Sequence, residues 1–135
     1  DIVYNLPKEI WNKPWVKVLL IGDEEVLDEF EKEYRNKYDK GMSVRSGANY
    51  LDVIGNGTSK GEGLLKLIEL YNLDKGKIIA VGDNMNDLEM IHIAKYGFIL
   101  KNGTKRVLEK AKLIAPSNDE NPIKYIIDYV EKNIK

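Results

Sequence analysis

Cysteine is absent from the 135 residues of the chain, which excludes disulfide bonds and metal sites built on thiolates. An excess charge of one sign is absent as well, because 21 basic and 22 acidic residues leave a formal net charge of −1. Binding to nucleic-acid phosphates needs a basic surface, so we expect no nucleic-acid partner. Neither an apolar run long enough to cross a bilayer nor the pattern of a signal peptide is present. These absences predict a globular protein of the cytoplasm without a membrane partner.

Segments typical of strands and of helices alternate along the chain. Short apolar or alternating runs bounded by turn residues predict strands over residues 15–21, 77–81, 97–100 and 112–115, with two more within 42–55. Amphipathic runs predict helices over residues 23–38, 60–72, 86–95 and 105–111, and from Pro122 onward. This alternation is typical of an α/β fold with a mainly parallel sheet. The turn-rich residues 55–59 are the expected boundary between a hairpin-rich lobe, residues 1–58, and an alternating lobe, residues 59–135.

The segment VGDNMND places four oxygen-bearing side chains where a predicted strand has ended and a helix begins: Asp83, Asn84, Asn86 and Asp87. In open α/β sheets, ligands bind at this carboxyl edge of the strands. Magnesium takes one or two protein carboxylates and fills its other positions with water and substrate phosphate. The loop therefore predicts half of a magnesium–phosphate site. The alternative is a plain helix cap made by Asn86 or Asp87.

A second polar feature lies at the start of the helix predicted over residues 60–72. Ser59 and Glu62 are spaced as a capping box, and Lys60 follows in the first helical turn. A cation there is unfavourable by about 0.3–1 kcal/mol, because the helix dipole is positive at this end. An anion such as phosphate at the same place explains the lysine. The alternative is a solvated lysine with no ligand.

Together, SKGEGL with Lys60 and the VGDNMND loop resemble the third and fourth motifs of the haloacid dehalogenase (HAD) superfamily, most closely its Cof-like phosphatases. The segments LLIGDEE, VRSGANYLDVI and SNDEN resemble the same subfamily. The resemblance implies that residues 1–58 are the C-terminal part of an α/β cap domain. Residues 59–135 would be the C-terminal part of a Rossmann-like core with a parallel sheet. It also implies a Mg²⁺-dependent phosphatase, a phosphoric monoester hydrolase acting on small phosphorylated metabolites.

The resemblance further implies a role for each polar residue. Asp83 would bind Mg²⁺ directly, and Asn84 would stand beside the metal as a weaker candidate. Lys60 would neutralise the phosphoryl oxygens, and Asn86 would contact the phosphoryl group or the substrate. Asp87 would orient Lys60 or a metal-bound water. Such a set suits phosphoryl transfer, which is catalysed mainly by positioning and charge neutralisation.

The predicted cap hairpin offers weaker candidates for binding. In the resembled family the cap covers the active site and selects the substrate, which makes Arg45, Ser46 and Asn49 candidate substrate contacts. The alternative is an exposed strand pair without such a role.

The family's nucleophile, an aspartate in a D-x-D motif that forms an aspartyl-phosphate, has no counterpart in these residues. The nearest match, LLIGDEE, is better explained as the start of a helix at Asp23. We therefore expect this chain to be inactive alone and to be completed by a missing N-terminal half or by self-association. In the family the strand before Asp83 pairs with the nucleophile's strand, so here it should form an unpaired sheet edge. The alternatives are a non-catalytic metal-binding, phosphate-binding or regulatory module, and one half of a two-chain enzyme.

Overall fold

A computed structural model describes residues 7–133 and divides their strands between two three-stranded sheets. One sheet is antiparallel, in the order β1-β3-β2. The other is parallel, in the order β4-β5-β6. The strands are β1 (Lys17–Ile21), β2 (Gly41–Gly47), β3 (Tyr50–Gly55), β4 (Ile79–Gly82), β5 (Tyr96–Leu100) and β6 (Leu113–Ala115). The predicted α/β fold with a parallel sheet is confirmed, and the hairpin-rich segment contributes the separate antiparallel sheet.

The helices agree with the predicted segments except around residue 86 and after residue 108. The α-helices are α1 (Glu24–Lys37), α2 (Lys60–Tyr71), α3 (Leu88–Ile93), α4 (Lys105–Leu108) and α5 (Pro122–Asn133). The 3-10 turns are η1 (Lys8–Asn12), η2 (Lys75–Lys77) and η3 (Met85–Asp87). The helix predicted over 86–95 is thus a 3-10 turn followed by a short α-helix. No helix within residues 7–133 has the length and apolar character to cross a membrane.

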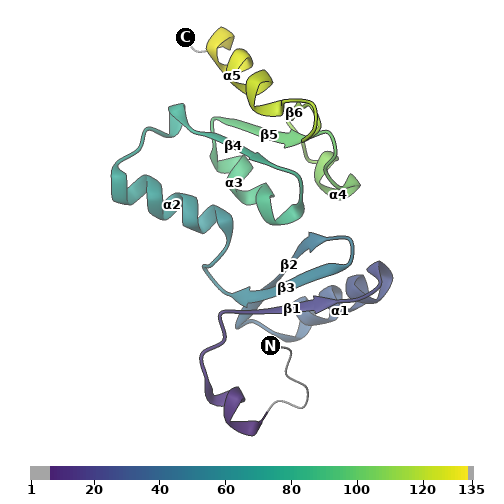
Figure 1. Ribbon diagram of the computed structural model, residues 1–135. Coiled ribbons are helices and arrows are strands. Elements are labelled where there is room, and N and C mark those ends of the chain that lie inside the picture. Colours follow the sequence, from purple (N-terminus) through teal and green to yellow (C-terminus); the bar gives the residue numbers. More distant parts are fainter. Residues whose placement is uncertain (1–6, 134–135) are drawn as a thin grey trace.

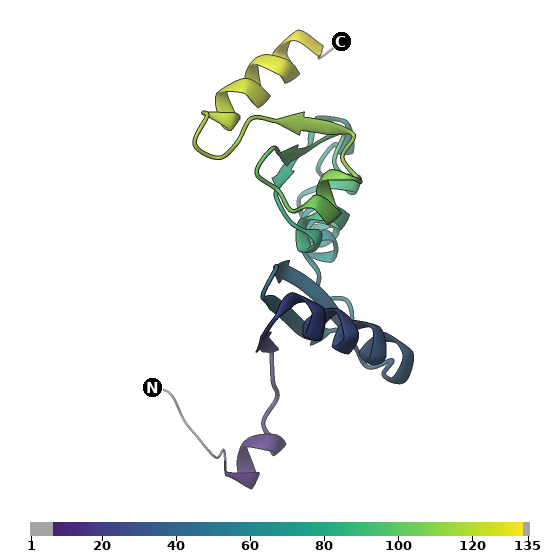
Figure 2. The ribbon, with the colours of Figure 1, turned by 90° about the vertical axis from the view of Figure 1, so that its right-hand side faces the viewer.

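The two sheets lie in two lobes placed end to end, as both views show (Figure 1 and Figure 2). We call residues 17–55 the antiparallel lobe and residues 60–133 the parallel lobe. In the antiparallel lobe, α1 covers one face of the sheet, and Leu27 and Leu51 are buried there. Residues 56–59 connect the lobes and include Gly57, whose φ of 71° is readily adopted by glycine.

The core of the parallel lobe is built on both faces of β5. Phe98 packs on one face against Ala115 of β6 and Ile126 and Val130 of α5. The next residue, Ile99, faces the other way and packs against Ala80, Ile91 and Val107. This alternation is expected of a strand covered on both sides, and each large buried side chain contributes about 1.5–3 kcal/mol. The central strand therefore anchors β4, whose end carries the polar loop.

Strand β4 lies at the edge of the parallel sheet. Among the strands of residues 7–133 it pairs only with β5, and Ile79 at its start is 42% exposed. The expected edge position of the strand before Asp83 is therefore confirmed. An unpaired edge presents free N–H and C=O groups on which a further strand can add.

Candidate functional site

The polar loop starts where β4 ends, at the carboxyl edge of the parallel sheet. Gly82 is the last residue of β4, and a Cβ added there would lie 2.3 Å from the Cβ of Asp87. Glycine is therefore required for the turn to pack Asp87 against the strand end. Residues 83 and 84 then lead into η3 and α3. The sequence thus folds the loop back so that Asp87 lies beside Asp83.

Asp87 is the buried centre of this loop. Its Oδ2 accepts hydrogen bonds from the backbone N–H groups of Asp83 at 3.1 Å and Asn84 at 3.2 Å. Its Oδ1 accepts from the Nζ of Lys60 and forms an ion pair with it. The carboxylate is only 7% exposed, and both of its oxygens are engaged. Asp87 therefore fixes the loop and places the lysine, which leaves it poorly suited to bind a metal directly.

Lys60 reaches the loop because of how α2 begins. Ser59 is the N-cap of α2, and its side chain accepts a hydrogen bond from the N–H of Glu62 at 3.1 Å. The hydroxyl of Ser59 also bonds to Glu89 of α3, which ties the two helices together. The Lys60 side chain is 52% exposed and carries three donors, of which Asp87 takes one. Two donors remain for an anion at the same edge.

Asp83 presents a carboxylate that makes no hydrogen bond or ion pair with the other described residues. The residue is exposed, and its backbone carbonyl accepts from the N–H of Thr104 at 3.1 Å. Across residues 7–133 there is no group of three or more histidine or acidic side chains that could hold a metal. Because Mg²⁺ needs only one or two protein carboxylates, a single free carboxylate beside the ion pair of Lys60 and Asp87 fits this ion.

The two asparagines of the loop differ in what they contact. Asn84 caps η3, because its Oδ1 accepts from the N–H of Met85 at 2.8 Å and from the Thr104 hydroxyl at 3.5 Å. Together with Asp87 it forms a capping box. Of the two residues expected to cap the helix, Asp87 takes part, as a member of this capping box and as the N-cap residue of α3, whereas Asn86 caps neither helix. The side chain of Asn84 is used inside the loop instead of pointing to a separate metal position.

Asn86 has a buried Oδ1 without a hydrogen-bond partner among the described residues. A buried acceptor without a hydrogen bond lowers the stability of the fold by about 1–3 kcal/mol. This cost favours a hydrogen-bond partner from outside the described residues. Asn86 also lines a cavity of about 330 Å³ between the lobes. Met42 and Val44 of β2 form part of one wall, and Leu88 of α3 forms part of the other. Asn86 and its neighbour Met85 are thus loop residues that line a cavity shared by both lobes.

Two residues of the site were missed by the sequence analysis. Thr104 holds the backbone of Asp83 and the side chain of Asn84, as described above. Gly103 packs against the same loop, since an added Cβ would lie 2.9 Å from the carbonyl oxygen of Asp83. Both follow β5, the neighbour of β4, and their position just beyond a parallel strand is the signal that points to them.

The candidate substrate contacts of the hairpin have other partners. Arg45 is only 4% exposed and donates to Asp28, to the carbonyl of Glu24 at 2.8 Å and to the carbonyl of Ala48. Asn49 donates to the carbonyl of Gly22 at 2.9 Å. The side chains of Arg45 and Asn49 are thus engaged within the antiparallel lobe, although Arg45 also lines the cavity of about 330 Å³ beside Asn86. The substrate contacts predicted for Arg45, Ser46 and Asn49 stay predictions.

The loop after β6 is tied to the same edge of the sheet. The N–H of Asn118 donates to the Oδ1 of Asn102 at 3.0 Å. The hydroxyl of Ser117 donates to Asp119, and this bond lowers the pKa of that carboxyl below its ordinary value. Asn102 thus takes part in connecting loops rather than in the cluster of Lys60 and Asp83.

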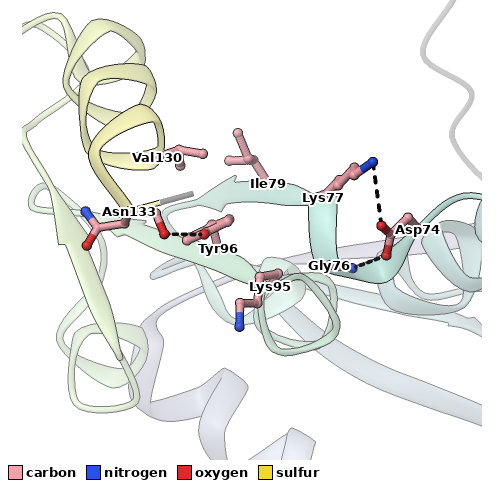
Figure 3. A pocket seen from close by; sticks show the side chains of 8 residues that line it. All are labelled: Asp74, Gly76, Lys77, Ile79, Lys95, Tyr96, Val130 and Asn133. Carbon is pink, nitrogen blue, oxygen red and sulfur yellow. Dashed lines mark hydrogen bonds and ion pairs between the residues drawn. The ribbon is translucent and has the colours of Figure 1, made fainter. Parts of the chain in front are cut away.

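A larger cavity, of about 640 Å³, lies at the opposite end of the parallel sheet (Figure 3). Its walls include Ile79 and Tyr96, which begin β4 and β5, and Val130 of α5. The Tyr96 hydroxyl donates to the carbonyl of Asn133 at 3.2 Å. Ligands of open α/β sheets bind at the carboxyl ends of strands, so this cavity is not the candidate site. It opens beside the start of the free edge of β4.

Comparison with known proteins shows the family to which the chain belongs. A family model described as haloacid dehalogenase-like hydrolase matches residues 1–127. A putative phosphatase of Streptococcus pyogenes serotype M6 is 29% identical over 127 residues, which cover 93% of this chain and 47% of that protein. The 5-amino-6-(5-phospho-D-ribitylamino)uracil phosphatase of Bacillus subtilis is 32% identical over 97 residues, 72% of this chain and 34% of that protein.

Among solved structures, a haloacid dehalogenase-like hydrolase of Bacteroides thetaiotaomicron is similar with a TM-score of 0.64 at 31% identity, over 87% of this chain and 44% of that protein. The crystal structure of a Streptococcus mutans protein is similar with a TM-score of 0.77 at 32% identity. The match covers 86% of this chain and 45% of that protein. The chain therefore spans about half the length, or less, of the proteins to which it is similar.

Proposed function

The chain belongs to the haloacid dehalogenase-like hydrolases, in their Cof-like group, and we propose that its protein is a Mg²⁺-dependent phosphatase of small phosphorylated metabolites. Residues 1–58 would form the C-terminal part of the cap, and residues 59–135 the C-terminal part of the core. The observation that carries the proposal is the Lys60–Asp87 ion pair beside the free carboxylate of Asp83. It brings a phosphate-binding cation and a metal-binding anion to one edge of the sheet.

In this proposal each residue acts through its own contacts. Lys60, oriented by Asp87, donates to the phosphoryl oxygens and reduces their repulsion of an attacking carboxylate. Asp83 would hold Mg²⁺, which when bound would supply further positive charge to the phosphoryl group. Asn86 binds a polar atom of the phosphoryl group or substrate through its unpaired side chain. Asn84 and Thr104 keep the backbone of Asp83 in place.

The nucleophile of the proposed reaction comes from outside residues 1–135. Its carboxylate oxygen attacks phosphorus, the bond to the leaving alcohol breaks, and water then cleaves the aspartyl-phosphate to inorganic phosphate. Residues 1–135 alone would therefore be inactive. A second polypeptide that brings this carboxylate would complete the site equally well, as in a two-chain enzyme.

Hydrolysis of phosphate monoesters by the full-length protein tests the function. We expect release of inorganic phosphate from members of a panel of sugar, nucleotide and ring-bearing phosphates with Mg²⁺. Chelation with EDTA should abolish the activity, and excess Mg²⁺ should restore it, because the single positive charge of Lys60 cannot neutralise the phosphoryl group by itself. Hydrolysis of equal rate in EDTA would contradict the metal requirement. Binding of Mg²⁺ and inorganic phosphate without any hydrolysis would instead support a non-catalytic binding or regulatory module.

We propose a partner for the free edge of β4 as well: a strand from the N-terminal half of the protein or from a second copy. Support comes from the unpaired edge and the exposed Ile79, together with α2, where Leu70 is 73% and Tyr71 66% exposed. We expect the 135-residue chain alone to sediment as a dimer or larger species in dilute solution. Analytical ultracentrifugation measures this, and a stable monomer with a cooperative unfolding transition would contradict it.

A further inference from the structure

Three arginines and two carboxylates gather where α1 of the antiparallel lobe meets α4 of the parallel lobe. Glu31 is 6% exposed and accepts a hydrogen bond from Arg35 at 2.6 Å. Arg45 donates to Asp28, and its Nε lies 3.7 Å from Oε2 of Glu31. Arg106 of α4 donates to Asp28 at 3.3 Å and to Glu31 at 3.4 Å. We call these five residues the arginine–carboxylate cluster.

Arg106 is the member of the cluster that belongs to the parallel lobe. Asp28 and Glu31 already have arginine partners in their own lobe, in Arg45 and Arg35. The contacts of Arg106 therefore add attraction between the lobes rather than neutralising an otherwise unpaired carboxylate. Its side chain is 43% exposed, so dissolved salt can screen this attraction.

The segment that carries Arg106 also supports the loop of Asp83. Thr104, two residues before Arg106, donates its N–H to the carbonyl of Asp83 and its hydroxyl to Asn84. Gly103 leaves no room for a side chain between itself and the same carbonyl. Residues 103–106 thus contain both Arg106 and the residues that contact the backbone of Asp83. A displacement of Arg106 would therefore act on a segment that supports the Asp83 carboxylate.

We infer that Arg106 is a positioning residue that holds the antiparallel lobe against the parallel lobe and sets its place over the loop of Asp83. Elsewhere the lobes meet through β2 and η3, beside the cavity of about 330 Å³. That contact leaves space for the antiparallel lobe to move when Arg106 is removed. The contact of Arg106 with the antiparallel lobe does not depend on the proposed phosphatase activity. Its expected effect on turnover rests on that proposed function.

A distance measurement between the lobes tests the inference in the full-length protein. Residues 1–135 contain no cysteine, so Glu29→Cys and Lys110→Cys provide one spin label on each lobe, with any cysteine elsewhere replaced by serine. We expect a narrow distance distribution in the parent and a broader, longer one after Arg106→Ala. The ratio of closed to open molecules should fall by about 2- to 5-fold. Raising salt from about 0.05 M to about 0.5 M should broaden the parent distribution but not that of the variant.

Two control variants and one kinetic measurement separate this role from a general loss of charge or of fold. Lys105→Ala removes a neighbouring cation that forms no ion pair among the described residues, and it should leave the distribution unchanged. Arg106→Lys keeps the charge and should restore part of the closed population. In hydrolysis assays, Arg106→Ala should raise KM by the same factor by which it lowers the fraction of closed molecules. The change in kcat should be smaller. An Arg106→Ala distribution identical to the parent, or an equal change in Lys105→Ala, would overturn the inference.

Discussion

Replacing Asp83 by alanine is expected to lower kcat of the full-length protein by about a thousandfold, because a metal contributes several kcal/mol of charge stabilisation to phosphoryl transfer. The folded state should be nearly unaffected, since the side chain is exposed and makes no contact that the fold needs. Steady-state hydrolysis with Mg²⁺ measures the first effect, and thermal unfolding measures the second. Titration calorimetry should show weaker Mg²⁺ binding in the same variant.

Asp74→Ala is a matched control for this experiment. Asp74 is also an exposed aspartate beside β4, but it lies before the strand and accepts from the N–H of Gly76 at 2.8 Å. Its removal should leave kcat and Mg²⁺ binding at the parent values. Parent activity in Asp83→Ala would remove Asp83 from the mechanism and with it the proposed metal site.

Replacing Asp87 by alanine is expected to affect both stability and activity. Two backbone N–H groups of the loop and the ammonium of Lys60 lose their acceptor, which costs about 2 kcal/mol of unfolding free energy. A misplacement of about 1 Å in a catalytic group can lower the rate by about a hundredfold, and we expect a loss of that size here. Chemical denaturation measures the free energy of unfolding, and hydrolysis assays measure kcat.

Two further variants distinguish the loss of stability from the loss of activity. Asp87→Asn keeps an oxygen for the N–H groups but loses the charge that pairs with Lys60, so stability should recover more than activity. Asp52→Ala removes a buried aspartate of the antiparallel lobe, whose Oδ1 lies 3.1 Å from the Nζ of Lys17. It should lower stability while leaving kcat almost unchanged. An Asp87→Ala variant with full activity would show that Lys60 does not depend on this carboxylate.

The parts of the fold that depend on local patterns were predictable from the sequence. The strand before Asp83 and the helix that starts at Lys60 are each specified within about a dozen residues by apolar period and capping. The pairing of Lys60 with Asp87 needed more, because 27 residues separate them and spacing alone does not bring them together. The resemblance of the two motifs to the family predicted this pairing, which hydrophobic periodicity could not.

The arginine–carboxylate cluster could not be predicted in the same way. Glu31 lies in a helix rich in charged residues, and nothing in its neighbours distinguishes a buried glutamate from an exposed one. Its partners Arg45 of β2 and Arg106 of α4 lie 14 and 75 residues further along the chain. Likewise, capping by Asn86 or Asp87 was predicted without Asn84, which caps η3 because a 3-10 turn precedes the α-helix.

The contact between Arg106 and Glu31 also bears on the order in which the chain folds. Only Ala48 and Asn49 separate β2 from β3, and a hairpin of this kind forms within about 1–10 μs. Arg106 and Glu31 are 75 residues apart, so their meeting requires closure of a long loop after both lobes have taken shape. The contact is therefore a late event in folding and an early one to be lost on unfolding. A newly synthesised chain would carry a finished hairpin well before its two lobes come together.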